Sequence, residues 1–178
     1  IVIPGVNGFT VYKADLHTHS VYSDGDVTPE YRVREAWNDG LDVIAMTDHV
    51  EYRRQEDKLI SYLKGYIPEG TKAINNRIID KPADERGIQV DLNIPVKLAQ
   101  AAAHAYGIVV IPGAEVTRTP ETIGHYNALF TKDNNTIYAT DPFVSVQNAK
   151  AQGAEMIITA CPLCKYNLEK NGTEVPVV

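Results

Sequence analysis

Short runs of apolar, mostly β-branched residues alternate along this chain with stretches whose apolar positions recur at helical spacing. That alternation is typical of βαβ units around a mainly parallel sheet or barrel, so we expect an α/β fold. The expected strands are residues 11–16, 42–47, 108–112, 126–131 and 155–159.

Capping residues and glycines mark the expected helices. Thr28 has the side chain of a helix cap and precedes a proline, and Gly40 then ends the helical pattern. The expected helices are residues 28–40, 94–106 and 141–153. Residues 66–90 contain three turn-like clusters and weak periodicity, so we interpret them as an inserted excursion over the surface.

Composition narrows the function. The 178 residues are 44% hydrophobic and 22% charged, with a net charge of -6, as expected for one soluble globular domain. No basic run attracts a nucleic-acid backbone, so duplex nucleic acid is not an expected partner. No apolar run approaches the ~20 residues that cross a bilayer. Because the first residue is Ile1 rather than Met, the compartment stays open between the cytoplasm and export after removal of a signal peptide.

Potential metal ligands directly follow three of the expected strands. His17 and His19 follow the first, and both imidazoles can reach one ion because residues i and i+2 of an extended segment share a side. Asp48 and His49 follow the second strand, and Glu115 follows the third. Singly, such residues are often surface turns or strand caps. Their coincidence where βα loops gather favours a divalent-metal site.

The remaining polar candidates are placed less directly. Asp24 and Asp26 lie in the loop after the first strand. His125 precedes the expected strand 126–131, so it reaches the other ligands only if that strand is antiparallel or the preceding loop curls over the rim. His104, among alanines, is interpreted as a helix-face residue.

Four segments carry a resemblance to a known family. They are "DLHTHSVYSDGDVTPE", "AWNDGLDVIAMTDHVEY", "GAEVT" and "GHYNALF". Over roughly residues 9–157 they resemble the polymerase and histidinol phosphatase (PHP) family of metal-dependent phosphoesterases. The resemblance implies a distorted (β/α)7 barrel with two or three metals at the strand C-termini. Within the family, the chain is most similar to stand-alone PHP proteins of unassigned substrate.

The resemblance also implies a set of metal ligands. They are His17, His19, Asp24, His49, Glu115 and His125. The two histidines of the HxH motif would bind a first metal, which Glu115 bridges to a second that His125 also binds. Asp24 and His49 would hold a third metal. The expected metals are Zn, Mn or Fe, and the expected catalytic residues are His17, His19, His49 and Glu115.

The implied reaction is hydrolysis of a phosphomonoester or phosphodiester. Two cations that share a carboxylate lower the pKa of a water between them and neutralise charge on the phosphate oxygens. Arg53, Arg54 and Arg118 lie just past strand ends and could hold a phosphate, although loop arginines are more often simply solvated. The expected partner is a phosphorylated small molecule or a short nucleotide, and the oligomeric state stays open.

The family pattern is not completed in this chain. After the last expected strand the family has an Asn-His-Pro, whereas this sequence reads "TACPLC", and a later Asp-x-His pair has no counterpart. Each of the three expected metals therefore lacks one ligand, and the expected barrel is incomplete. We divide the chain into a C-terminally truncated PHP-type domain, residues 1–157, and a foreign-looking tail, residues 158–178.

The tail resembles a different family. "GAEMIITACPLCKYNLE" is similar to the cysteine-rich domain of heterodisulfide-reductase-type subunits, where a CPxC contributes to iron–sulfur ligation. Cys161 and Cys164 are the only cysteines, too few for a disulfide framework. We expect them to be idle reduced thiols near the start of a helix over 162–170, or Cys161 to replace the missing histidine in part.

The leading hypothesis is a PHP-type phosphoesterase that acts through metal-activated water. One alternative is a non-catalytic remnant that binds a cation or serves as an interaction module. Another is an electron-transfer fragment built on the CPxC tail. Other HxH hydrolases of the amidohydrolase type also remain, although they lack the HTHS-x-x-SDG run.

Overall fold

The computed structural model describes residues 3–50, 91–117, 125–137, 139, 141–153, 157–158, 165–166, 169–170 and 176–177. Its strands are β1 (Ala14–Thr18), β2 (Val43–Met46), β3 (Val109–Thr117), β4 (His125–Leu129) and β5 (Ile157–Ile158). Its helices are α1 (Pro29–Asn38), α3 (Ile94–Ala103), α4 (Pro142–Ala151) and the short 3₁₀ turn η3 (Asn134–Thr136). The α/β class expected from the sequence is what these elements form.

The helix boundaries follow from local hydrogen bonding. The hydroxyl of Thr28 accepts a bond from the N–H of Tyr31 and so caps α1. Beyond the other end of α1, Gly40 adopts a φ of 71°, a left-handed conformation that favours glycine. Helix α3 ends at Ala103 rather than at residue 106, because the N–H groups of Ala105 and Tyr106 bond to carbonyls three residues back instead of four.

The five strands lie in the order β1-β2-β3-β4-β5. Parallel pairing joins β1 to β2 and β2 to β3, as the sequence predicts. Strand β4 instead pairs antiparallel with both β3 and β5, so it alone runs against the other four strands and the sheet is mainly parallel, as expected. Strand β4 returns along β3 from Thr117↔His125 to Gly113↔Leu129, and this pairing extends β3 beyond its predicted end at residue 112.

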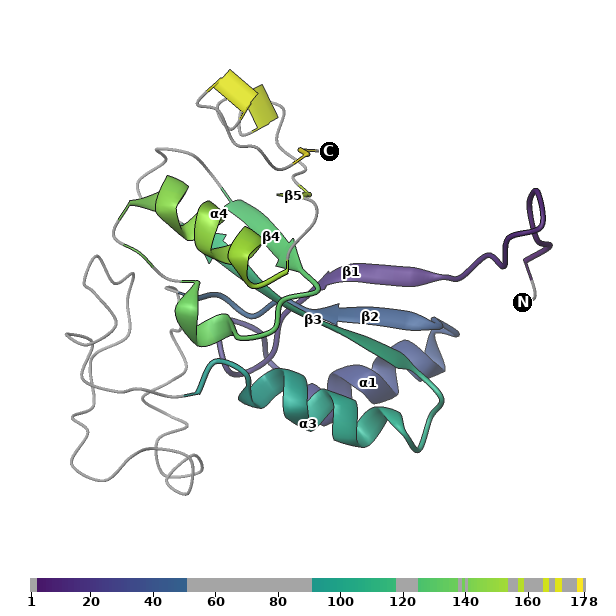
Figure 1. The fold of residues 1–178 in the computed structure, drawn as a ribbon. Helices are drawn as coiled ribbons and strands as arrows, with labels where there is room; N and C mark the ends of the chain where they lie inside the picture. The colour runs from purple at the N-terminus through teal and green to yellow at the C-terminus, as the bar shows by residue number, and fades with distance from the viewer. Residues whose placement is uncertain are drawn as a thin grey trace.

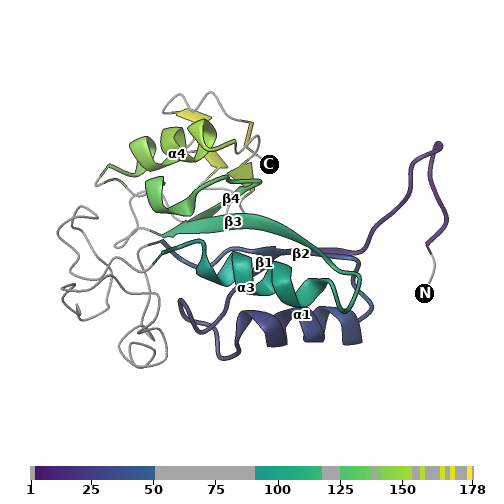
Figure 2. The same cartoon turned by 60° about the horizontal axis from the view of Figure 1, so that its bottom comes forward.

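Helices α1 and α3 lie side by side against one face of β1–β3, which we call the outer face (Figures 1 and 2). Ile44 and Met46 of β2 pack there with Val33 of α1 and Ala99 of α3 in one apolar cluster. Burying each large aliphatic side chain contributes about 1.5–3 kcal/mol. This layer fixes β2, and therefore the residues that follow it, relative to β1 and β3.

Helix α4 covers the second half of the sheet, beside β4 (Figure 1). Ala114 and Val116 of β3 and Tyr126 of β4 pack with Val146 of α4 in a second cluster. Their neighbours one residue along each strand point to the opposite face, because side chains alternate in extended chain. That face, which we call the inner face, therefore carries Glu115.

The inner face has an apolar floor below Glu115. Ala45, Ile111 and Leu129 pack together there. Val109, also on this face, is 56% exposed, so the floor is partly open among the described residues. A metal site built on Glu115 would therefore lie above an apolar layer rather than in bulk solvent.

Several predictions lie outside the described residues. These are the excursion over 66–90, the tail cysteines and the loop arginines, namely Arg53, Arg54, Arg118, Cys161 and Cys164. Of the expected tail helix, residues 165–166 and 169–170 are helical. Among the described residues, no helix has both the length and the apolar character that crossing a membrane requires.

Candidate metal centre

An irregularity in β1 directs the HxH pair to the inner face. Between Asp15 and Thr18 the chain takes one more residue than the paired stretch of β2, which is a β-bulge. Thr18 is buried, and its hydroxyl donates to the carbonyl of Ala45 at 2.6 Å. Because side chains alternate, His17 and His19 on either side of Thr18 point away from it, toward the inner face.

Three donor atoms converge at the end of that face. Nε2 of His17 lies 2.7 Å from Nε2 of His19. Oε2 of Glu115 lies 3.0 Å from the first nitrogen and 2.9 Å from the second. The Glu115 side chain is only 3% exposed, whereas that of His17 is 50% exposed. The group is thus anchored in the sheet and open to solvent on one side.

The antiparallel return of β4 brings His125 to the same carboxylate. Nδ1 of His125 lies 2.9 Å from Oε1 of Glu115, the oxygen not used by the HxH pair. A parallel β4 would have left His125 at the far end of the sheet. The two oxygens of Glu115 therefore face different histidines, an arrangement suited to a carboxylate that bridges two cations.

A second group forms around His49. Its Nε2 lies 3.4 Å from Oδ2 of Asp24, and Nδ1 of His19 lies 3.3 Å from the other Asp24 oxygen. Nδ1 of His49 lies 3.4 Å from Oε2 of Glu115. A parallel bridge between His49 and Glu115 holds the two backbones together. The structure thus offers two three-residue groups able to hold a cation, which share His19.

Glu115 and the histidines around it shift one another's pKa values. Burial raises the pKa of its carboxyl, but hydrogen bonds from His17 and His19 and nearby imidazole charge lower that pKa well below its ordinary value. Burial lowers the pKa of His19, yet the hydrogen bond and charge of Glu115 outweigh burial and raise it overall. Burial is the main reason that the pKa of His49 is lowered. An ionised Glu115 and a neutral His49 are the forms that bind a divalent cation.

The chemistry of the donor set fits such a cation. Imidazole nitrogens and carboxylate oxygens are ligands that Zn²⁺, Mn²⁺ and Fe²⁺ accept. A tetrahedral Zn²⁺ with ligands about 2.1 Å away spaces them by roughly 3.4 Å. The 2.7 to 3.0 Å separations around Glu115 therefore need to widen by roughly half an ångström on binding. The exposed side chain of His17 can make that adjustment.

Asn127 is a site residue that the sequence analysis missed. It lies directly opposite Glu115 in the β3–β4 pair, so the two side chains share the inner face. It is 6% exposed, and its Oδ1 has no hydrogen-bond partner among the described residues. Such a buried orphan costs roughly 1–3 kcal/mol, and a bound cation would supply its partner. Its position two residues after His125 on a strand was the available signal.

Asp48 does not point toward the metal ligands, although its position in the sequence beside His49 suggested a ligand. It follows β2 beside His49, but its carboxylate faces the loop after β1 and accepts hydrogen bonds from Ser20 and Ser23. Asp48 is 9% exposed and belongs to neither three-residue group. Asp26 is exposed and likewise lies outside both groups.

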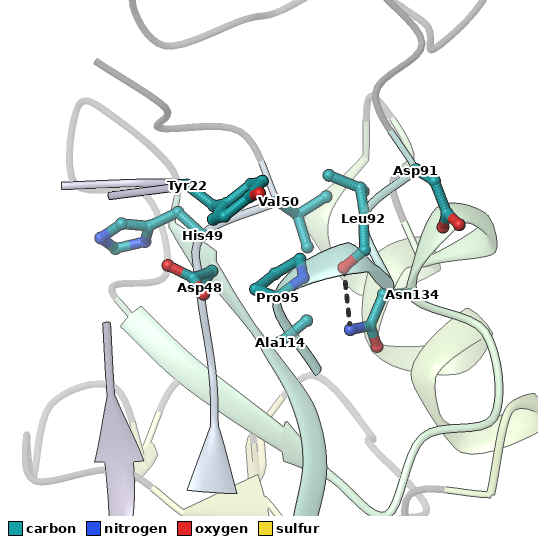
Figure 3. A pocket seen from close by; sticks show the side chains of 9 residues that line it. All are labelled: Tyr22, Asp48, His49, Val50, Asp91, Leu92, Pro95, Ala114 and Asn134. Carbon is teal, nitrogen blue, oxygen red and sulfur yellow. Dashed lines mark hydrogen bonds between the residues drawn. The ribbon is translucent and has the colours of Figure 1, made fainter. Parts of the chain in front are cut away.

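A small pocket of about 10 Å³ lies beside His49. Figure 3 shows Asp48 and His49 at one end of it and Asp91 and Asn134 at the other. Between them the lining is mostly apolar, with Leu92 among the residues. A volume of this size holds about one water molecule.

The six predicted ligands therefore lie together, each in contact with another member of the set. His104 lies elsewhere, exposed at the end of α3.

Comparison with known proteins identifies a matching protein family. Residues 15–152 match the PHP domain. A two-domain protein from Bacteroides vulgatus, which contains a predicted PHP-like metal-dependent phosphoesterase, superposes with a TM-score of 0.68 at 28% identity. The match covers 95% of this chain but 44% of that protein, so this chain spans less than half its length. No curated protein matches the chain.

Two further structures match more weakly. A proposed metal-dependent phosphoesterase from Bifidobacterium adolescentis matches with a TM-score of 0.40 at 21% identity, over 81% of this chain and 34% of that one. An amidohydrolase from Chromobacterium violaceum, solved with sulfate and no metal, matches with a TM-score of 0.41 at 20% identity, over 78% of this chain and 32% of that one. Similarity at this level carries no functional argument.

Proposed function

The chain belongs to the PHP domain family, and from that membership we propose that it is a metal-dependent phosphoesterase that hydrolyses a phosphomonoester or a phosphodiester. The Bacteroides vulgatus structure supports the proposal, because its PHP-like part is described as a metal-dependent phosphoesterase. The proposal concerns the reaction class. It leaves the particular substrate to be identified by assay.

One observation carries the proposal: His17, His19 and Glu115 place three ligand atoms within 3.0 Å of one another. His17 lies in β1, His19 directly follows it and Glu115 lies in β3, 98 positions after His17 in the sequence. The fold thus brings two imidazoles to one carboxylate oxygen. A cation would bind all three atoms once they move apart by roughly half an ångström.

The assigned roles follow from which atoms lie together. His17 and His19 would hold a first cation together with Oε2 of Glu115. His125 would hold a second cation together with Oε1 of Glu115, so that Glu115 would bridge the two. Asp24 and His49 would hold a further cation. When bound, such cations lower the pKa of water and neutralise charge on phosphate oxygens. The protein would orient these ligands above the apolar floor of Ala45, Ile111 and Leu129.

Finer features belong to the same proposal. The curled sheet, with its exposed inner-face Val109, is consistent with part of a PHP barrel, and we propose that the full barrel has seven βα units. We also propose that the domain ends near residue 157 and that the tail from 158 is separate. Zn²⁺, Mn²⁺ or Fe²⁺ would be the metal, and a phosphorylated small molecule or short nucleotide the substrate.

A chelation assay tests the proposal. Purified protein would be assayed with p-nitrophenyl phosphate and bis-p-nitrophenyl phosphate, before and after chelation, with each of the three metals then added back. We expect hydrolysis that chelation abolishes and one metal restores. The matched variants are Glu115→Gln, which should abolish activity, and Asp91→Asn, which changes a carboxylate outside the centre and should not.

Each outcome has a distinct meaning. Metal binding without turnover of either ester would support the alternative of a non-catalytic metal-binding module. Turnover that survives thorough chelation, or that Glu115→Gln leaves intact, would contradict the proposal. A brown iron–sulfur chromophore in the purified protein would instead favour the electron-transfer alternative for the tail.

A further inference from the structure

A chain of hydrogen bonds runs behind His19, on the side away from Glu115. Oδ1 of Asp48 accepts from the hydroxyl of Ser23 at 2.7 Å and from the backbone N–H of Ser20 at 2.7 Å. The Ser23 oxygen also lies 3.2 Å from Nδ1 of His19. Ser23 is fully buried and therefore joins a buried carboxylate to one particular imidazole nitrogen.

This series of hydrogen bonds determines where the proton of the Ser23 hydroxyl points. A serine hydroxyl has a single proton to donate, and an ionised carboxylate can only accept. The short bond to Asp48 is charge-assisted and stronger than a bond to a neutral imidazole. The Ser23 proton therefore points to Asp48, and the Ser23 oxygen is left to accept a proton from Nδ1 of His19.

We infer that Asp48 and Ser23 are positioning residues that hold His19 in the tautomer with its proton on Nδ1 and its lone pair on Nε2. Nε2 is the atom that lies 2.9 Å from Oε2 of Glu115, where the proposed first cation would bind. The inference rests on the proposed function, because a cation at Nε2 would replace the contact of that nitrogen with Glu115 and leave the ring proton on Nδ1, next to Ser23.

Asp24 is the competing partner for the same nitrogen. Its Oδ1 lies 3.3 Å from Nδ1 of His19, close to the 3.2 Å of the Ser23 oxygen. Asp24 also contacts Nε2 of His49, so a second imidazole influences its orientation. The Ser23 hydroxyl lies 2.7 Å from Asp48 and 3.5 Å from Asp24, so Asp48 fixes its orientation.

Ser20 provides a matched control. Ser20 and Ser23 are both fully buried, and both hydroxyls bond to Asp48. Of the two, only Ser23 contacts His19. Replacing either serine by alanine removes one hydroxyl from the same carboxylate, so the two variants should lose similar stability. They should differ only in what happens at His19.

The experiment compares Ser23→Ala with Ser20→Ala in the full chain. Zn²⁺ affinity would be measured by competition with a chromophoric chelator, unfolding by urea, and the histidine tautomers by ¹⁵N NMR. We expect Ser23→Ala to lower Zn²⁺ affinity by about tenfold and to shift the His19 nitrogen signals. Ser20→Ala should change neither, at a comparable loss of stability. Equal Zn²⁺ affinities for the two variants would overturn the inference.

The Zn²⁺-loaded wild-type protein gives a test that needs no variant. Its ¹⁵N shifts should report that His19 binds the cation through Nε2 and carries its proton on Nδ1. Binding through Nδ1 would overturn the inference alone, even if both serine variants failed to fold. Wild-type protein that binds no Zn²⁺ would contradict the proposed function and the inference together.

Discussion

Two clusters built around carboxylates contribute residues to opposite ends of one pocket, His49 from the first and Asp91 from the second (Figure 3). They differ in what faces their carboxylates. At the first, Glu115 faces the imidazoles of His17, His19, His49 and His125. An imidazole nitrogen carries a proton in some states and a lone pair in others. The bonds of this cluster therefore depend on protonation, or on a cation that replaces the proton.

At the second cluster the carboxylate of Asp91 meets groups that always donate. Oδ1 accepts from the side-chain amides of Asn93 and Asn135, each at 2.9 Å, and Oδ2 accepts from the ammonium of Lys97 at 2.7 Å. Asn134 extends the network by donating to the carbonyl of Gly113 at 2.7 Å. This cluster joins the start of α3 to η3 and β3. Its hydrogen bonds form without a cation.

The difference teaches how a structural polar network can be told from a metal centre. Both clusters are rich in oxygen ligands, so a count of acidic residues does not separate them. What separates them is whether the opposing groups are permanent donors. Amide N–H and ammonium groups donate to a carboxylate at neutral pH, and they have no lone pair for a cation. An imidazole can instead give up the proton that it donates and offer that nitrogen's lone pair to a cation. The imidazole cluster is therefore the one suited to a cation.

The largest effect is expected at the first cluster. Glu115→Gln removes the charge at which four imidazoles meet, so Zn²⁺ affinity should fall by at least about a hundredfold. Isothermal titration of metal-free protein would measure it. Asp91→Asn is the control, since it neutralises the other cluster's carboxylate and should leave affinity within about twofold. Similar losses in both variants would mean that the two clusters do not differ as described.

A stability effect of intermediate size is expected in the second cluster. Asn134 is 3% exposed, and Asn134→Ala would leave the carbonyl of Gly113 and the hydroxyl of Thr131 without their bonds at 2.7 and 2.6 Å. The free energy of unfolding should fall by about 2 kcal/mol, measured in urea on metal-free protein. The exposed Asn135 offers the control, because Asn135→Ala should cost well under about 1 kcal/mol. A reversed order would contradict this account.

A smaller effect should depend on pH. Burial raises the pKa of Asp91, but hydrogen bonds from Lys97, Asn135 and Asn93 lower it from 3.8 to about 2. A carboxyl with a lowered pKa stabilises the fold above its unfolded-state pKa and loses that contribution as pH falls toward the folded value. The stability difference between wild type and Asp91→Asn should therefore shrink as pH falls from about 5 to about 3. Parallel pH profiles for the two proteins would contradict this.

The smallest effect is expected at the histidine that belongs to neither cluster. His104 is exposed at the end of α3, so His104→Ala should change the free energy of unfolding by less than about 0.5 kcal/mol. Zn²⁺ stoichiometry should be unchanged. A lost equivalent of Zn²⁺ in this variant would show that histidine count, rather than placement, explains metal binding.

The residue types and order of the first cluster could be predicted from the sequence, because strand ends and turn residues are local signals. His17, His19, His49 and Glu115 each follow a short apolar run, and parallel pairing of β1–β3 brings those ends together. The helix caps at Thr28 and Asp141 were equally local and are present as expected. Short-range chemistry determined all of these positions.

Features that depend on pairing between distant strands could not be predicted. The reversal of β4 decides where His125 lies, and nothing in residues 126–131 alone specifies it. The extra residue between Asp15 and Thr18 is visible only against the register of β2. Asp48 looked like a ligand in "TDH", but the two serines that hold its carboxylate belong to the loop after β1. Sequence motifs identify ligand types, whereas side-chain direction comes from tertiary register.

Glu115 also joins parts of the chain that are very unequally separated. His125 is 10 residues away from it and His17 is 98. The near contact needs only a hairpin, while the far one closes a long loop whose entropy cost grows slowly with length. A cation held by both would act as a cross-link, so that part of its binding free energy becomes folding free energy. Unfolding of the metal-loaded chain must then either release the cation or carry that closed loop into the unfolded state.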